Sequence, residues 1–302
     1  FLTKALLCGM LLAMGVSIVT GSPDNAMPVF SQVAGAGGGV AETESTNLLA
    51  GIVSVLVLTP FFYAGFDTIP QQAEEAAEGL NWNKFGKIIT LALLAAGGFY
   101  MVCIYSFGTI LPWNEFVAQP VPALACLKNI NMILYVAMLV IATLGPMGPM
   151  NSFYGATSRI MLAMGRKGQL PEKFAEVDEK SGAPKLACVV LGIITVIGPF
   201  LGKNMLIPLT NVSALAFILS CTMVALACLK MRYTEPDLPR PYKVPGGKFG
   251  ILLAILAGAI IIGLLVLPFS PASLNMVEWS IVLGWLVVGL ILMFATKALS
   301  LI

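Results

Sequence analysis

The sequence contains no histidine and few charged residues. Only 11% of its 302 residues are Asp, Glu, Lys or Arg, whereas an ordinary soluble domain carries about 25%. Without histidine, the chain has neither a histidine-ligated metal site nor a Ser-His or Cys-His catalytic pair. Its six cysteines show no paired spacing, which argues against a disulfide framework or a zinc site. We therefore predict no metal, no cofactor and no enzymatic activity, and the net charge of +2 gives no reason to expect a nucleic-acid partner.

Hydrophobic residues, in contrast, make up 58% of the chain. A helix needs roughly 20 apolar residues to cross the hydrocarbon of a bilayer. This composition predicts an all-α integral membrane protein with eight transmembrane helices, in contact with the lipid bilayer. The predicted spans are Phe1 to Thr20, Leu48 to Phe66, Phe85 to Ile110, Met132 to Met150, Leu186 to Leu201, Met205 to Leu229, Phe249 to Leu267 and Trp279 to Phe294.

The basic residues are distributed unevenly between the loops that join these spans. Alternate loops hold fourteen Lys and Arg residues on one side, and only Lys128 and Lys203 on the other. Basic residues in short loops are retained on the cytoplasmic side of a membrane. We therefore expect both chain ends to lie in the cytoplasm, and we expect the plasma membrane as the location.

The second span is interrupted by Pro60 and Gly65 and is followed by Asp67. A carboxylate near hydrocarbon costs roughly 2.5 to 3.5 kcal/mol, so such a residue normally faces a protein interior or a water-filled path. Broken backbone is tolerated at this depth only where it is buried in protein or lines a cavity, and secondary transporters build substrate sites from such helices. The pattern predicts a broken helix near residues 60–66.

Three stretches, in matching order, resemble the amino acid-polyamine-organocation (APC) superfamily of amino acid permeases. The first is Phe61-Phe-Tyr-Ala-Gly65-Phe-Asp67 with Ala73-Glu-Glu75, the second runs from Ser158-Arg159 to Ala183-Pro184, and the third is Leu229-Lys-Met-Arg232 with Glu235-Pro-Asp-Leu-Pro-Arg240-Pro-Tyr-Lys-Val-Pro245. Together they extend over most of the chain, and the third is long enough to be fairly specific.

The resemblance implies a five-plus-five inverted-repeat transporter fold, in which two peripheral helices follow two repeats of five. This chain would then be a truncated version, a single membrane domain over residues 1–302 that carries helices five to twelve of twelve. Residues 1–20 would be the last helix of the first repeat, residues 48–230 the complete second repeat, and residues 249–294 the peripheral helices. A signal peptide is the alternative interpretation of the first span.

The resemblance also implies a substrate site at the broken helix, where unwound peptide groups bind ions and zwitterions directly. Phe61 lies near a gating aromatic of the family, and with Phe62 forms the aromatic side of the site, while Ala64 and Gly65 offer backbone groups to the amine of the substrate. The alternative for the two rings is ordinary packing.

Asp67 and Lys4 correspond to family positions that are used in proton coupling. Asp67 has the alternative role of capping the second half-helix, and Lys4 that of snorkelling to the interface. Asn151, Thr157 and Ser158 are candidates for an ion site, although Ser and Thr hydroxyls in helices more commonly bond back to the backbone.

These expectations describe a secondary active transporter for amino acids or related amines, which works by alternating access and as a symporter coupled to protons. The alternative is a non-transporting truncated fragment or scaffold subunit. A channel stays open as a further alternative. The sequence does not select one amino acid, because the pocket would be completed by helices outside this chain.

Overall fold

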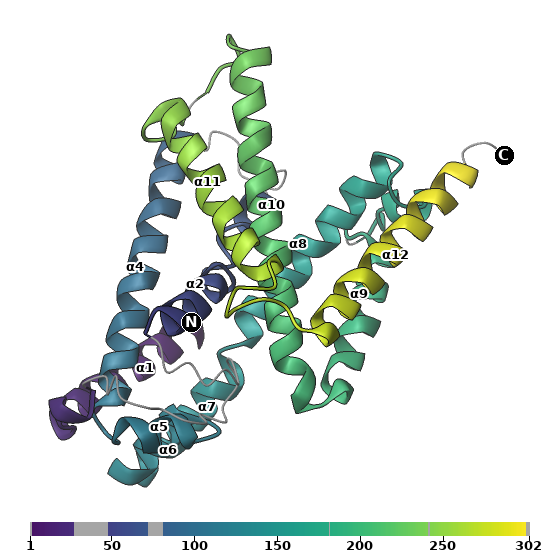
Figure 1. Cartoon of the computed structure of the whole chain (residues 1–302). Helices are drawn as coiled ribbons and strands as arrows, with labels where there is room; N and C mark the ends of the chain where they lie inside the picture. Colours follow the sequence, from purple (N-terminus) through teal and green to yellow (C-terminus); the bar gives the residue numbers. More distant parts are fainter. Residues whose placement is uncertain (1, 27–47, 72–80, 181, 241, 300–302) are drawn as a thin grey trace. The chain divides into compact units, whose positions relative to one another are not determined.

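The computed structural model describes residues 2–26, 48–71, 81–180, 182–240 and 242–299 (Figure 1). All regular secondary structure in these ranges is helical, as the composition predicts. The longer helices are α1 (Leu2–Thr20), α2 (Leu48–Phe62), α4 (Trp82–Gly108), α7 (Met132–Leu144), α8 (Met147–Arg166), α9 (Lys185–Ile197), α10 (Leu206–Thr234), α11 (Gly247–Val266) and α12 (Met276–Leu299). The shorter ones are α3 (Thr68–Gln71), α5 (Trp113–Ala118), α6 (Pro122–Ile130), and the 3-10 helices η1 (Pro23–Ala26), η3 (Glu172–Ala175), η4 (Gly198–Leu201) and η5 (Lys203–Met205).

The apolar helices fall on the eight predicted spans. In the described part of the chain, five segments are long and apolar enough to cross a membrane: Lys84–Gly108, Met132–Arg166, Leu206–Thr234, Gly247–Val266 and Met276–Phe294. Three shorter apolar segments, Lys4–Thr20, Leu49–Phe62 and Lys185–Leu201, account for the rest. Large side chains such as Leu94 on α4 and Trp285 on α12 are more than 70% exposed, which suits a surface that meets lipid. The prediction of an all-α membrane protein is confirmed.

The fourth predicted span, Met132 to Met150, lies within a longer helical segment that continues to Arg166. The chain breaks earlier, between α7 and α8, at Gly145 and Pro146. Polar residues that follow Met150 are accommodated inside α8, where the Ser158 hydroxyl donates to the Gly155 carbonyl at 2.7 Å. Such a back-bond satisfies a hydroxyl without leaving the helix.

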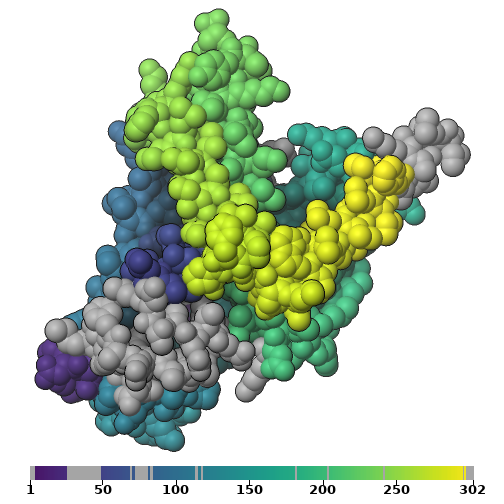
Figure 2. All heavy atoms as spheres, viewed as in Figure 1, coloured from purple at the N-terminus to yellow at the C-terminus, as the bar shows by residue number. Residues whose placement is uncertain are grey.

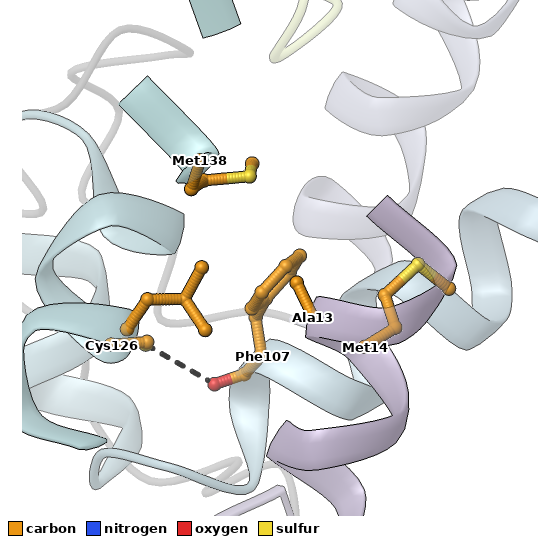
Figure 3. Packing of buried hydrophobic residues seen from close by; sticks show 6 residues of the cluster. Ala13, Met14, Phe107, Cys126 and Met138 are labelled. Atoms are coloured by element: carbon orange, nitrogen blue, oxygen red, sulfur yellow. Dashed lines mark hydrogen bonds between the residues drawn. The ribbon is translucent and has the colours of Figure 1, made fainter. Parts of the chain in front are cut away.

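The helices form two packing units. The first comprises Phe1–Ser54 and Gly86–Asn151, and its core is the set of buried side chains in Figure 3: Ala13, Met14, Phe107, Cys126, Leu127 and Met138. Within it α6 contacts α1, α5 and α7. The Cys126 thiol lies 3.4 Å from the Phe107 carbonyl oxygen, to which it donates. The helices α1, α4, α6 and α7 therefore share one apolar core.

The second packing unit comprises Val55–Phe85 and Ser152–Ile302. Helix α10 contacts both α11 and α12, and Figure 2 shows the atoms of α11 against those of α10. A Cβ atom at Gly258 of α11 would lie 2.1 Å from the Thr222 hydroxyl of α10, so the two helices approach closely because a glycine stands there. Small residues at helix contacts are typical of membrane proteins. The core of this unit consists of Val57, Leu58, Ala214, Leu215, Leu265 and Leu274.

Candidate functional site

The predicted helix break is present. Helix α2 ends at Phe62, residues 63–67 form turns, and α3 begins at Thr68. Pro60, which was expected to interrupt the helix, stays inside α2. The chain leaves the helix after Phe62, and within the turns Gly65 has a φ of +130°, which is open to glycine but strained for other residues. The sequence therefore located the break correctly to within a few residues, and Gly65 is the residue that permits it.

Asp67 closes this break with its side chain. Its Oδ1 accepts a hydrogen bond from the Gly65 amide at 2.8 Å, and its Oδ2 accepts one from Gln71 Nε2 at 3.2 Å. The carboxylate, which is half-buried, thus connects the turn to the first turn of α3. These two bonds differ from a helix N-cap, in which the side chain accepts from the backbone amides of the helix that follows, so both roles considered for Asp67, capping and proton coupling, stay predictions.

Some peptide groups of the break form hydrogen bonds within the described part of the chain, and others do not. The Thr68 hydroxyl donates to the Gly65 carbonyl at 2.7 Å, and the Ala64 amide donates to the Phe61 carbonyl at 3.1 Å. Within the described ranges, the Ala64 carbonyl and the Phe66 amide make no hydrogen bond. Peptide groups without partners are costly away from water, so these two are available to a bound zwitterion.

The aromatic side chains around the break differ in their surroundings. The rings of Phe61 and Phe62 lie edge to face with centroids 6.1 Å apart, and they are 36% and 47% exposed. The ring of Phe66 contacts Phe217 of α10, with the two centroids 6.1 Å apart and an interplanar angle of 88°. The first two rings are therefore accessible to a ligand, whereas Phe66 anchors the break to α10.

The other predicted site residues lie elsewhere in the chain. Lys4 on α1 and Asn151 on α8 are exposed and belong to the first packing unit, while the break belongs to the second. Thr157 is half-buried and Ser158 is buried, with its hydroxyl bonded to Gly155. In the described part, no hydrogen bond joins Thr157 or Ser158 to residues 61–67. Glu74, Glu75 and Glu78, which follow the break, lie outside the described residues.

Sequence reasoning did not identify two partners of the break. Gln71 follows Asp67 by four residues, a spacing that brings side chains together on a helix, so this pair could have been found. Phe217 lies 151 positions after Phe66 and carries no local signal. Cys221, one helical turn further along α10, is close enough to Asp67 to interact with its charge.

Comparisons of the sequence with known proteins identify the family of the chain. A family model described as amino acid permease matches residues 1–293. The chain is 26% identical over 247 residues to the branched-chain amino acid permease BcaP of Bacillus subtilis, a match that covers 81% of this chain and 50% of that protein. It is 28% identical over 197 residues to the vacuolar cationic amino acid transporter 2 of Arabidopsis thaliana, covering 63% and 29% respectively.

A third relative is the aspartate-proton symporter of Bacillus subtilis, which is 32% identical over 116 residues, or 37% of this chain and 22% of the symporter. The chain therefore spans about half the length of the first of these relatives, and less of the others. The three names give three different classes of amino acid substrate.

Proposed function

The chain belongs to the amino acid permease family, and we propose that it carries amino acids or related amines across a membrane by alternating access. The observation that carries this proposal is the helix break at residues 63–67, which follows the apolar helix α2 and separates it from α3. Transporters use such discontinuous helices to bind substrates with freed backbone groups. An uninterrupted apolar helix would have offered no such groups.

The substrate site in this proposal consists of Phe61, Phe62, Ala64 and Gly65. The Ala64 carbonyl accepts a hydrogen bond from the substrate amine, because it has no partner in the described part of the chain. The rings of Phe61 and Phe62 contact the side chain of the substrate, since both are exposed beside the break. Apolar rings at this position favour a neutral amino acid over a charged one.

Proton coupling forms the second part of the proposal. Asp67 is the principal candidate because its two oxygens accept hydrogen bonds from neutral donors, Gly65 and Gln71. Protonation turns one of these oxygens from an acceptor into a donor, and this loosens the turn at the break. Lys4 is the second candidate, and Asn151, Thr157 and Ser158 are proposed to assist a cation. One relative is named as a proton symporter, which supports this part.

The proposed setting is the plasma membrane, with both chain ends in the cytoplasm. The support is the distribution of basic residues, which leaves only Lys128 and Lys203 in the loops assigned to the outer side. Symport of a proton with the substrate would then use the inward proton gradient.

Transport by purified protein in liposomes tests the function. We expect saturable uptake of radiolabelled neutral amino acids, stimulated by an inward proton gradient and absent from protein-free liposomes. Excess unlabelled substrate should compete. Absence of uptake and of substrate binding by calorimetry, for a folded and correctly inserted protein, would favour the alternative of a non-transporting membrane scaffold.

A further inference from the structure

A buried carboxylate at the start of α12 has no part in the site described above. Glu278 is 2% exposed and lies in the first turn of α12. It forms a reciprocal cap with Asn275: the Asn275 amide donates to Glu278 Oε2 at 2.7 Å, and the Glu278 amide donates to Asn275 Oδ1 at 2.9 Å. This arrangement is a capping box, which satisfies two backbone donors at the beginning of a helix.

The cap uses only one of the two carboxylate oxygens. The other, Oε1, accepts a hydrogen bond at 2.5 Å from Nδ2 of Asn211, which lies on α10, 67 positions earlier in the chain. A capping box functions equally well at an exposed helix end, whereas burial of a carboxylate is costly unless its oxygens are satisfied. The helix cap alone does not explain why Glu278 is buried, whereas its hydrogen bond to Asn211 of α10 does.

The segment of α10 that Glu278 holds is also the segment that supports the helix break. Ala214 and Leu215, one turn after Asn211, share an apolar core with Val57 and Leu58 of α2. Trp279 and Val282 of α12 pack against the same core. Phe217 lies half a turn further along α10, and its ring contacts the ring of Phe66 in the break. One short stretch of α10, residues 211–217, thus contacts α12 through Asn211 and the broken helix through Phe217.

We propose that the hydrogen bond between Asn211 and Glu278 is a clamp that fixes α12 to α10. By fixing α10, the clamp holds the ring of Phe217 against Phe66 of the broken helix. The two side chains are positioning residues, because they act on the substrate site through α10 and Phe66. The effect of the clamp on substrate binding rests on the proposed transport function. The hydrogen bond between α10 and α12 does not depend on that function. In a bilayer, where apolar helices gain little by leaving lipid for one another, such a polar bond helps to define how they dock.

Spin labels on α10 and α12 test the clamp directly. Leu219 and Leu283 are exposed on the two helices, so each can be replaced by a labelled cysteine in a variant without the native cysteines. We expect a narrow distribution of distances between the labels, and a broadened distribution in Asn211→Leu. An unchanged distribution in Asn211→Leu overturns the clamp, whether or not the protein transports.

Uptake kinetics test the positioning role. We expect Asn211→Leu to raise KM and the substrate Kd by roughly tenfold, the order expected for loss of a hydrogen bond to a charged group. Asn275→Ala is the matched control, because it removes the cap bond to the Glu278 amide and leaves Asn211 in place. The control should lower the melting temperature without changing KM.

The positioning role and the clamp can be contradicted separately. If the label distances broaden in Asn211→Leu but KM and Kd stay at the wild-type values, the positioning role is wrong. If Asn211→Leu does not fold, Asn211→Ala takes its place, since alanine also removes the donor to Glu278 and adds no bulk. Absence of uptake by the wild-type protein would count against the proposed function, while the label distances would still decide the clamp.

Discussion

The Gly65 amide donates its hydrogen bond to Asp67 Oδ1 across 2.8 Å, and this contact closes the break between α2 and α3. One of the two residues supplies the backbone conformation of the break, and the other supplies the only charge in residues 61–71. A change in the charge of Asp67 therefore acts on the backbone that is proposed to bind the substrate. Two of the predictions below concern this break, and two concern the packing of helices within the two units.

Replacement of Gly65 by alanine should strain the break without a steric clash. A Cβ atom at Gly65 meets nothing within 4 Å, but the φ of +130° is unfavourable for alanine. We expect a loss of about 1 to 3 kcal/mol in the free energy of unfolding and reduced uptake. Gly98 of α4 is the control, because a Cβ atom there also meets nothing within 4 Å and no positive φ is involved. Equal effects of Gly65→Ala and Gly98→Ala on melting temperature and uptake would contradict this account.

Replacement of Asp67 by asparagine separates its charge from its hydrogen bonds to Gly65 and Gln71. The asparagine Oδ1 can still accept from the Gly65 amide, and Gln71 can present its oxygen to the new amide group. We expect the melting temperature to stay nearly unchanged and the pH dependence of uptake to be lost. Asp67→Ala should lower both stability, by about 0.5 to 2 kcal/mol, and uptake. Retention of the wild-type pH profile in Asp67→Asn would remove Asp67 from proton coupling.

Cys126 should make the stability of the first packing unit sensitive to alkaline pH. The thiol is completely buried in α6, between two predicted spans, and burial raises its pKa from 9.0 to about 11. The unfolded chain therefore releases this proton first as the pH rises. The stabilisation is complete below pH 9 and is lost progressively between pH 9 and about 11.

Thermal unfolding of the wild-type protein and of Cys126→Ala, from pH 8 to 11, checks this prediction. Lysine and tyrosine titrations contribute equally to both proteins, so the difference between the two curves isolates the thiol. We expect the advantage of the wild type to shrink as the pH rises. A constant difference over the whole range would show that the thiol does not ionise differently in the folded and unfolded states.

Gly258 and Thr222 should show strong coupling in a double-mutant cycle. A Cβ atom at Gly258 would lie 2.1 Å from the Thr222 hydroxyl oxygen but 3.2 Å from its Cβ. That hydroxyl is held in place by its bond to the Ile218 carbonyl at 2.7 Å. We expect Gly258→Ala to cost about 1 to 3 kcal/mol, and Thr222→Ala to recover most of this loss. Additive effects of the two substitutions on the free energy of unfolding would contradict a direct contact between α10 and α11.

The sequence predicted the helix break because the necessary signals are local. Gly65 and Asp67 follow directly after a run of apolar residues. Each of these features restricts the local backbone conformation without help from distant residues. The role of Pro60 was nevertheless predicted wrongly, since a proline within a helix loses one hydrogen bond but need not end the helix.

By itself, the sequence determined the class of the protein, the positions of its apolar helices and the location of the break. These properties depend on composition and on neighbours along the chain, because a helix in lipid satisfies its own backbone. Only the tertiary structure decided that Phe66 rests on Phe217 and that Glu278 bonds to Asn211. Both contacts join residues far apart in sequence, and their geometry depends on how whole helices pack, which no local pattern encodes.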